Sequence, residues 1–372
     1  MTADPLPHSP TALAAPRAGA LPKMSDGRPP AGAGSAPGVV EELVREIAGA
    51  LATVEVHEER IKSGVSRLRS TVNGATRSFV AKRLDPDIAR RNELVARRWL
   101  PAIGLAELGP PLMGVAAERD GSSVWHLFDD LGDCGLDPAR ADPGAIALAV
   151  DAIARIHTRF AGHALIPECR LWGGDLGISF YVANVRDAIA SLESVRARRR
   201  RLGAERSSLC QRLLARLAGL LDEHAPRAEA LSRSGGPETL LHGDLWPMNV
   251  MVVASGGGRV VRLIDWDHAA VGPVSYDLST LLSRFPARQR LPILRRYERE
   301  VAAAGWRLPP TAELNLLFET AELARIANRV IWPALAAWED GAAWAFDALQ
   351  EVEHWFDQLT PLLPVDEACA QS

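Results

Sequence analysis

The chain of 372 residues carries a formal net charge of −4 and is 47% hydrophobic, which suits one large or two small domains with a substantial core. The mild acidity argues against a general nucleic-acid-binding protein, and no apolar run is long enough to span a bilayer. Proline and charged residues near the N-terminus break up the apolar core that a secretory signal would need. We therefore expect a cytoplasmic protein that has neither nucleic acid nor a membrane as its partner.

The N-terminal part of the chain changes character near residue 40. Residues 1–39 are rich in Pro, Ala, Gly and Ser and hold few bulky apolar residues, so we expect a disordered tail there and a second one at 366–372. An amphipathic helix is expected at 40–51. Short β-branched runs then predict antiparallel strands at 54–61, 67–72, 77–84, 112–117 and 123–128, with a helix at 86–100 between the third and the fourth.

The rest of the chain is mainly helical. Apolar periodicity predicts helices at 143–160, 179–195, 209–224, 291–304, 312–332 and 341–359. We expect residues 170–178 to be irregular and Pro333 to interrupt the helical pattern, because proline lacks a backbone donor. The arginine-rich run at 196–201 is expected to be a solvated face, with a polyanion-binding patch as the alternative.

Polar residues that suggest chemistry gather between residues 240 and 267. Two β-branched runs, 250–253 and 260–264, flank a Ser-Gly-Gly-Gly turn and predict a β-hairpin. A hairpin brings its outer ends together, so Asn249 and Asp265 are expected side by side. An amide oxygen beside a carboxylate suits Mg2+ when phosphate oxygens and waters complete its octahedron. Asp244 lies on the preceding loop, where its carboxylate could take a proton from an attacking hydroxyl.

The order of these residues carries a resemblance. His242-x-Asp244-x-x-x-x-Asn249 is followed by Ile264-Asp265-Trp266-Asp267, and then by Gly272-Pro273 and Asp277. This set resembles the aminoglycoside phosphotransferase and choline kinase superfamily, whose fold is similar to that of protein kinases. The resemblance implies a two-lobed, protein-kinase-like α+β fold. An N-lobe at 40–131, with an antiparallel five-stranded sheet and a helix, would bind nucleotide, and a larger, mainly helical C-lobe at 132–365 would carry catalysis and the acceptor.

The resemblance also implies roles for single residues. The reaction would move the γ-phosphoryl group of ATP, with GTP not excluded, to a hydroxyl of a small molecule. Asp244 would be the catalytic base, and Asn249 and Asp265 would hold Mg2+. The nucleotide would be bound by Lys82, oriented through an ion pair with Glu93, and by the loop that contains Gly64 and Ser66. Supporting roles are expected for His242, Asp267 and Asp277.

The acceptor is the least determined part of this prediction. Candidate acceptor-binding residues are Trp172, Glu319, Glu322, Arg325 and Trp332. Acidic groups would suit a cationic aminoglycoside, whereas Arg and Trp would suit a nucleoside or a sugar-like acceptor. Residues 319, 322 and 325 could equally form an ion-pair face on one helix. An antibiotic acceptor, giving resistance or self-protection, is implied by analogy only, and a monomer or a homodimer is expected.

Other functions fit part of the pattern. A catalytically silent, nucleotide-binding regulator would share the fold, although such proteins usually lack the base or a metal ligand. A metabolic kinase of the choline, homoserine or amino-sugar type would share the site. A metal-dependent phosphohydrolase would require several clustered His ligands. A protein kinase would require an activation loop, whereas only residues 267–275 separate the metal-binding Asp from the next helix.

Overall fold

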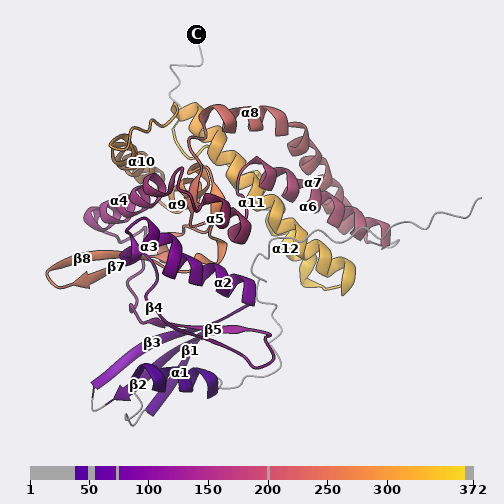
Figure 1. Ribbon diagram of the computed structural model, residues 1–372. Coiled ribbons are helices and arrows are strands. Elements are labelled where there is room, and N and C mark those ends of the chain that lie inside the picture. The colour runs from indigo at the N-terminus through magenta and orange to yellow at the C-terminus, as the bar shows by residue number, and fades with distance from the viewer. Residues whose placement is uncertain (1–37, 49–54, 73–74, 199–201, 365–372) are drawn as a thin grey trace, which may run out of the picture.

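The computed structural model describes residues 38–48, 55–72, 75–198 and 202–364 and places an antiparallel sheet beside a larger helical body (Figure 1). The expected α+β architecture is confirmed. The expected tails lie outside the described residues, except for residues 38–39, which begin the first helix. The run at 196–201 is described only as far as residue 198. The lobe boundary between residues 131 and 132 stays a prediction.

The sheet has the strand order β1-β2-β3-β5-β4 with every neighbouring pair antiparallel. Its strands are β1 (Glu55–Lys62), β2 (Val65–Val72), β3 (Ala75–Leu84), β4 (Leu112–Ala117) and β5 (Val124–Asp129). Helix α1 (Gly38–Ala48) covers one face, where Val40 and Val44 pack with Phe79 and Ala81. Because side chains alternate along a strand, Lys82 lies on the opposite face.

The predicted helix at 86–100 is interrupted by a π turn. It consists of α2 (Pro86–Leu94), the π turn Val95–Trp99 and the short α3 (Leu100–Ala102). A π turn holds one residue more than an α-helical turn, so the side chains before it are rotated relative to those after it. This difference decides which residue of α2 faces the sheet.

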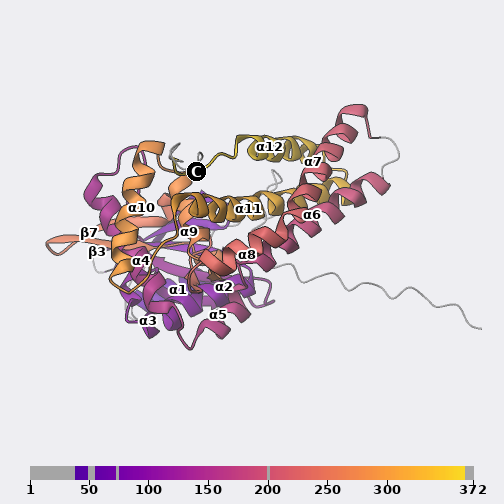
Figure 2. The same ribbon diagram turned by 90° about the horizontal axis from the view of Figure 1, so that it is seen from above.

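Most of the buried apolar side chains of the helical body belong to two large clusters. One is built around α4 and α10, and the other around α6, α7, α11 and α12, which extend together away from the sheet in Figure 2. The helices are α4 (Pro143–Phe160), α5 (Ile166–Gly173), α6 (Ile178–Arg198), α7 (Ala204–Asp222), α8 (His224–Ser234), α9 (Ser275–Ser283), α10 (Ala287–Ala302), α11 (Thr311–Glu339) and α12 (Trp344–Gln358). None of the described helices is long and apolar enough to cross a membrane.

Two predictions about the helical body were wrong. Residues 170–173 belong to α5 and are not irregular. Pro333 does not end its helix, because α11 continues to Glu339 with Pro333 buried inside it. The neighbours of Pro333, Val330 and Ala334, are fully buried in the second apolar cluster, and this packing outweighs the loss of one backbone hydrogen bond.

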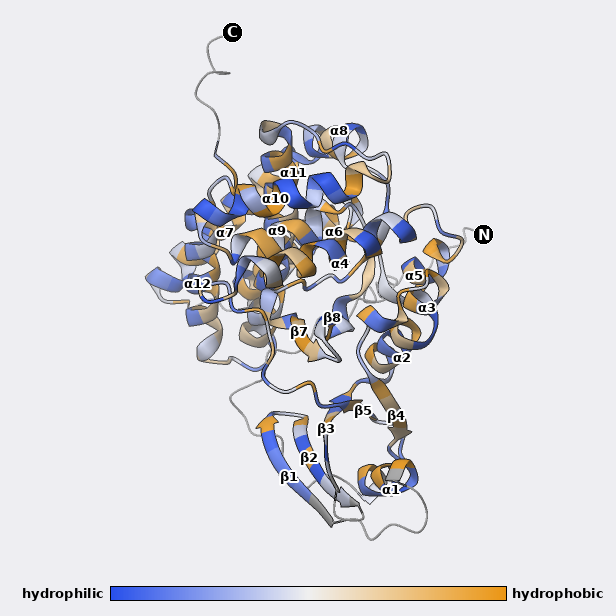
Figure 3. Cartoon of the chain, turned by 90° about the vertical axis from the view of Figure 1, so that its left-hand side faces the viewer, coloured by the Kyte–Doolittle hydropathy of each residue, from blue (hydrophilic) through white to orange (hydrophobic). Residues whose placement is uncertain are grey.

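The site is assembled by two short pairs of strands between the sheet and the helices, as Figure 3 shows for β7 and β8. The predicted hairpin is confirmed as β7 (Val250–Ser255) and β8 (Gly258–Leu263). Its turn is Gly256-Gly257, and both glycines have positive φ. A second antiparallel pair, β6 (Thr239–Leu241) and β9 (Ala270–Gly272), flanks the hairpin in the sequence and was not predicted. Together the two pairs bring the loops at 242–249 and 264–269 next to each other.

Candidate active site

The loop that carries Asp244 is held by a buried carboxylate. Asp277, on α9, accepts hydrogen bonds from the backbone N–H groups of His242 at 2.7 Å and Gly243 at 2.9 Å. The ring of His157 lies 3.3 Å away through its Nε2. Burial would raise the pKa of the Asp277 carboxyl, but these donors keep it below its usual range.

Residue 243 has to be a glycine. Its φ is +79°, and a Cβ at this position would lie 1.9 Å from the carbonyl oxygen of His268. The close approach fixes the distance between the two loops that carry Asp244 and Asp265. The spacing of the motif therefore has a steric cause as well as a chemical one.

His242 stiffens the loop, as expected. Its Nε2 is 2.9 Å from the carbonyl oxygen of Ile264, so the ring donates through Nε2. Its Nδ1 is then free to accept the backbone N–H of Asp244 at 3.4 Å. The ring lies against buried Trp266, with the centroids 4.6 Å apart. His242 thus links the two loops and takes no part in the open site.

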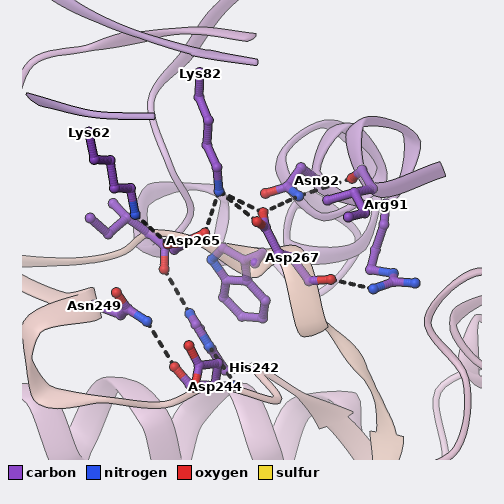
Figure 4. Close-up of polar contacts among 12 residues, drawn as sticks. Lys62, Lys82, Arg91, Asn92, His242, Asp244, Asn249, Asp265 and Asp267 are labelled. Carbon is purple, nitrogen blue, oxygen red and sulfur yellow. Dashed lines mark hydrogen bonds and ion pairs between the residues drawn. The ribbon is translucent and has the colours of Figure 1, made fainter. Parts of the chain in front are cut away.

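Asn249 and Asp265 lie next to each other at the open end of the hairpin (Figure 4). The backbone N–H of Ile264 donates to the carbonyl oxygen of Asn249 at 3.0 Å. The Asn249 amide nitrogen donates to the carbonyl oxygen of Asp244 at 2.9 Å, which leaves the amide oxygen available. An available amide oxygen beside a carboxylate fits a hard cation such as Mg2+.

Asp265 adopts a left-handed backbone conformation and binds Lys82. Its φ and ψ are 65° and 54°, a region that Asp tolerates better than most residues. The Lys82 ammonium contacts Asp265 and both carboxylate oxygens of Asp267, the latter at 2.8 Å. Burial would raise the pKa of the Asp265 carboxyl, but Lys82 lowers it to about 2. Burial would likewise lower the pKa of Lys82, whereas the two carboxylates keep it raised.

The expected ion pair between Lys82 and Glu93 is wrong. Glu93 accepts a hydrogen bond from Arg97 at 2.8 Å and lies 3.7 Å from Arg90, on the outer side of α2. That expectation treated residues 86–100 as one regular α-helix. The π turn adds one residue there, so Asn92 faces the site in its place.

Asn92 and Arg91 belong to the site, although no motif or spacing predicted them. The Asn92 amide donates to Asp267 at 2.9 Å, and Arg91 donates to the backbone carbonyl of Asp267. Arg91 also donates to the carbonyl oxygen of Trp172 at 3.0 Å. Both side chains are buried. They attach α2 to the loop that holds Asp267, and through it they position Lys82.

The turn between β1 and β2 lies beside Lys82. Gly64 has a φ of +69°, and its carbonyl oxygen accepts the N–H of Arg83 at 2.7 Å. Ser66 is already inside β2, and its hydroxyl donates to Glu58 at 2.6 Å. Lys62, which we did not predict, places its ammonium 4.0 Å from Asp265. Gly64 and Lys62 are therefore near the candidate nucleotide side, whereas the Ser66 hydroxyl is engaged within the sheet.

The acceptor candidates do not form one group. The Trp172 ring lines an open groove of about 540 Å³ between α2 and α5, and no residue of the Asp244 loop lines that groove. Glu319 lies 3.4 Å from Arg227, and Glu322 binds Arg325. The Trp332 indole nitrogen is buried and has no partner among the described residues. Glu322 and Arg325 thus form the expected ion pair within one helix, whereas Glu319 pairs with Arg227 of α8.

The Asp244 loop has two further neighbours that sequence reasoning missed. The guanidinium of Arg284 lies 3.5 Å from the ring centroid of Trp246, which follows Asp244 by two residues. The backbone carbonyl of His268 faces Gly243 of the loop. Burial lowers the pKa of the His268 ring, whereas Asp244 and Asp267 act to raise it. The described residues contain no group of three or more His, Cys, Asp or Glu side chains that could hold a metal. The clustered ligands that a metal-dependent phosphohydrolase would need are thus missing from the described part of the chain.

A comparison with protein families gave a match to the phosphotransferase enzyme family over residues 57–314. The matched region includes Lys82, Asp244, Asn249, Asp265 and Asp277. It ends before Glu319, Glu322, Arg325 and Trp332, so the match covers the proposed nucleotide and catalytic residues and leaves out most acceptor candidates.

Similar solved structures were also found. An ethanolamine kinase from Plasmodium vivax shares 11% identity with a TM-score of 0.52, covering 82% of each chain. A spectinomycin phosphotransferase bound to AMP shares 11% identity with a TM-score of 0.50, covering 86% of this chain and 99% of its own. An aminoglycoside phosphotransferase from Streptomyces rimosus, in complex with ADP and streptomycin, shares 17% identity with a TM-score of 0.47, covering 77% and 97%. None of the curated proteins compared with the chain matches it.

Proposed function

Because the chain belongs to the phosphotransferase enzyme family, we propose that it transfers the γ-phosphoryl group of ATP to a hydroxyl of a small molecule in the presence of Mg2+. The observation that carries the proposal is the meeting of three elements at one point. The Asp244 loop, the Asn249–Asp265 hairpin end and Lys82 of β3 converge from distant parts of the chain. Phosphoryl transfer needs such positioning and charge neutralisation more than covalent help.

Asp244 is suited to act as the base. Its backbone N–H and C=O are both fixed, while its carboxylate makes no hydrogen bond to any other described residue. The carboxylate is thus free to orient an acceptor hydroxyl and to take its proton. As the hydroxyl oxygen bonds to the γ-phosphorus, the bond from that phosphorus to the bridging oxygen breaks, and ADP leaves.

Asn249 and Asp265 would hold Mg2+ through an amide and a carboxylate oxygen. When bound, the metal ion supplies positive charge that offsets the charge of the phosphate groups. Lys82 now binds two carboxylates, and its ammonium would turn to the phosphates when these carboxylates find other partners. Gly64 and Lys62, beside it, would face the same phosphates.

The predicted acceptors range from cationic aminoglycosides to neutral sugar-like molecules. Antibiotic resistance or self-protection would follow from the first of these, and a metabolic role would follow from the second. Glu322 is paired with Arg325, and Glu319 shares Arg227 with Glu223, which lies nearer to it at 2.6 Å. Glu322 is therefore not free to bind a cationic acceptor, and this favours an acceptor that is not cationic.

The test is ATP consumption with Mg2+ over a panel of hydroxylated molecules, measured as ADP release. The Asp244→Asn variant keeps the size of the side chain and is expected to lower the transfer rate by about 10²–10⁴-fold. Its affinity for ADP, measured by calorimetry, should stay within about two-fold, since the base does not bind the nucleotide. The exposed Asp340→Asn variant serves as the matched control. Retained transfer in Asp244→Asn, or an equal loss in both variants, would contradict the assignment.

A further inference from the structure

The acids that could have bound a cationic acceptor are already in contact with arginines. Glu319 lies 3.4 Å from buried Arg227, which Glu223 binds more closely at 2.6 Å. Arg325 binds Glu322, donates to Ser279 at 2.9 Å and contacts the Tyr276 carbonyl. These contacts tie α8, α9 and α11 together, and pulling Glu322 toward a ligand would take the acid away from the Arg325 guanidinium.

Arg284 is the opposite case. It follows the end of α9, is exposed, and makes no hydrogen bond or ion pair to any described residue through its guanidinium. Partial burial lowers the pKa of Arg284, and the nearby Arg329 and Arg325 lower it further, against Glu322 and Asp244. An arginine remains charged under such conditions. A guanidinium that has no hydrogen-bonded or ion-paired acid among the described residues therefore lies beside the loop of the proposed base.

The Trp246 ring fixes the orientation of this charge. Trp246 is attached to the loop, because its backbone N–H donates to the carbonyl oxygen of Asp244 at 2.8 Å. The guanidinium carbon lies 3.5 Å from the centroid of the Trp246 ring, so the ring covers one face of the guanidinium plane. Its N–H groups then point outward along its edge, in the geometry that binds carboxylate or phosphate through two hydrogen bonds.

We propose that Arg284, stacked on Trp246, binds an anionic group of the acceptor, so that the acceptor is a hydroxylated anion and not a cationic aminoglycoside. The proposal rests on the proposed phosphoryl transfer, since it places the acceptor hydroxyl at Asp244. Trp246 and Asp244 belong to the same loop, so a single small molecule can reach both the base and the guanidinium. Carboxylate and phosphate share this chemistry.

A cationic acceptor would have to use an acid that can change partners. Glu319 is 46% exposed, and Arg227 would keep Glu223 at 2.6 Å if Glu319 turned away. Glu319→Gln therefore provides the opposing arm of the test.

The experiment uses acceptors that differ in charge on one scaffold. Gluconate and glucose 6-phosphate are the anions, glucose is the neutral member and glucosamine is the cation; glycerate, glycerol 3-phosphate, glycerol and ethanolamine repeat the series on a smaller scaffold, and streptomycin is added as a large cation. ADP release is measured with the full chain and Mg2+. We expect turnover above the water background for anions only, and the carboxylate and phosphate members separate the two sources of charge.

The variant Arg284→Gln should raise KM for the active anion by about ten-fold or more, with a smaller change in kcat, because a charge-assisted hydrogen bond is lost. The matched control is Arg295→Gln, an exposed arginine of α10 that makes no hydrogen bond or ion pair within the described residues. It should leave KM within about two-fold. A merely structural stack between Arg284 and Trp246 would alter stability and leave this KM unchanged.

Three results would overturn the proposal. One is a cation as the best acceptor, with turnover lost in Glu319→Gln. Another is an unchanged KM for the anion in Arg284→Gln. The last is that no anion is turned over and that none binds to the ADP-loaded chain in calorimetry. This result with ADP binding intact contradicts only the anionic acceptor, whereas absence of ADP binding contradicts the proposed function itself.

Discussion

Two carboxylates of the site, Asp277 and Asp265, are held in different ways. Asp277 is 1% exposed and is bound by two backbone N–H groups and a histidine ring. Asp265 is 30% exposed and is balanced mainly by Lys82. Backbone donors cannot leave without unfolding the loop, whereas a lysine side chain can change partners. The proposed base is thus presented by a preorganised loop, whereas the side-chain contacts of Lys82 on the proposed nucleotide side are free to change.

The largest expected effect tests the rigid side of this comparison. Asp277→Asn removes a charge that three donors share and turns an amide group toward backbone N–H groups. We expect the free energy of unfolding to fall by about 3–5 kcal/mol, as for a broken buried pair. Urea denaturation of this variant and of the exposed Asp340→Asn control would measure it. A loss below about 1 kcal/mol would mean that the loop does not depend on this carboxylate.

A pH titration tests the sheet beside Lys82. His126, on β5, pairs in register with Lys82, is fully buried, and has no hydrogen-bond partner for either ring nitrogen among the described residues. Burial, and then the charge of Lys82, lower the pKa of His126 from 6.5 to about 4. The unfolded chain therefore binds a proton near pH 6.5 that the folded chain takes up only near pH 4.

Above pH 6.5 the ring is neutral in both states and its titration does not lower the free energy of unfolding. As the pH falls from 6.5 toward 4, the free energy of unfolding drops by about 1.4 kcal/mol per pH unit. The variant His126→Leu should flatten the dependence of unfolding free energy on pH in this window, whereas His57→Gln, at an exposed position of β1, should not. Equal slopes in the three proteins would show that the ring of His126 gains a partner in solution.

The smallest expected effect compares neighbouring residues on α2. Asn92→Ala removes the donor that holds Asp267, and we expect KM for ATP to rise by about five-fold with kcat nearly unchanged, since one hydrogen bond is lost. Glu93→Ala removes an exposed ion pair with Arg97 and should change KM by less than about two-fold. The reverse order of effects would restore Glu93 as the partner of Lys82.

The parts of the site that could be predicted are those fixed by local chain geometry. The spacing from His242 to Asn249 and the hairpin that follows bring Asn249 to Asp265 whatever the rest of the fold does. The strand alternation that separates Lys82 from Arg83 is equally local: Arg83 donates to Ser123 at 2.9 Å on the other face.

The parts that could not be predicted depend on packing between distant elements. The partners of Glu319 and Glu322 follow from how α8 and α11 meet, which the spacing within one helix does not contain. Arg284 meets Trp246 only because α9 is anchored to the Asp244 loop by Asp277. Pro333 stays helical because its surroundings are packed, although its own backbone chemistry favours an end.

The π turn at Val95–Trp99 has a consequence for how related chains are compared. A sequence alignment pairs residues in their order along the chain. Assigning an aligned position to the face of a helix that meets a site then assumes a helix of uniform pitch. One extra residue in such a helix changes which side chain reaches a given point. Here an amide reaches it in place of the neighbouring acid, without any substitution. In this chain Asn92 reaches Asp267, whereas Glu93, the next residue, turns to Arg97.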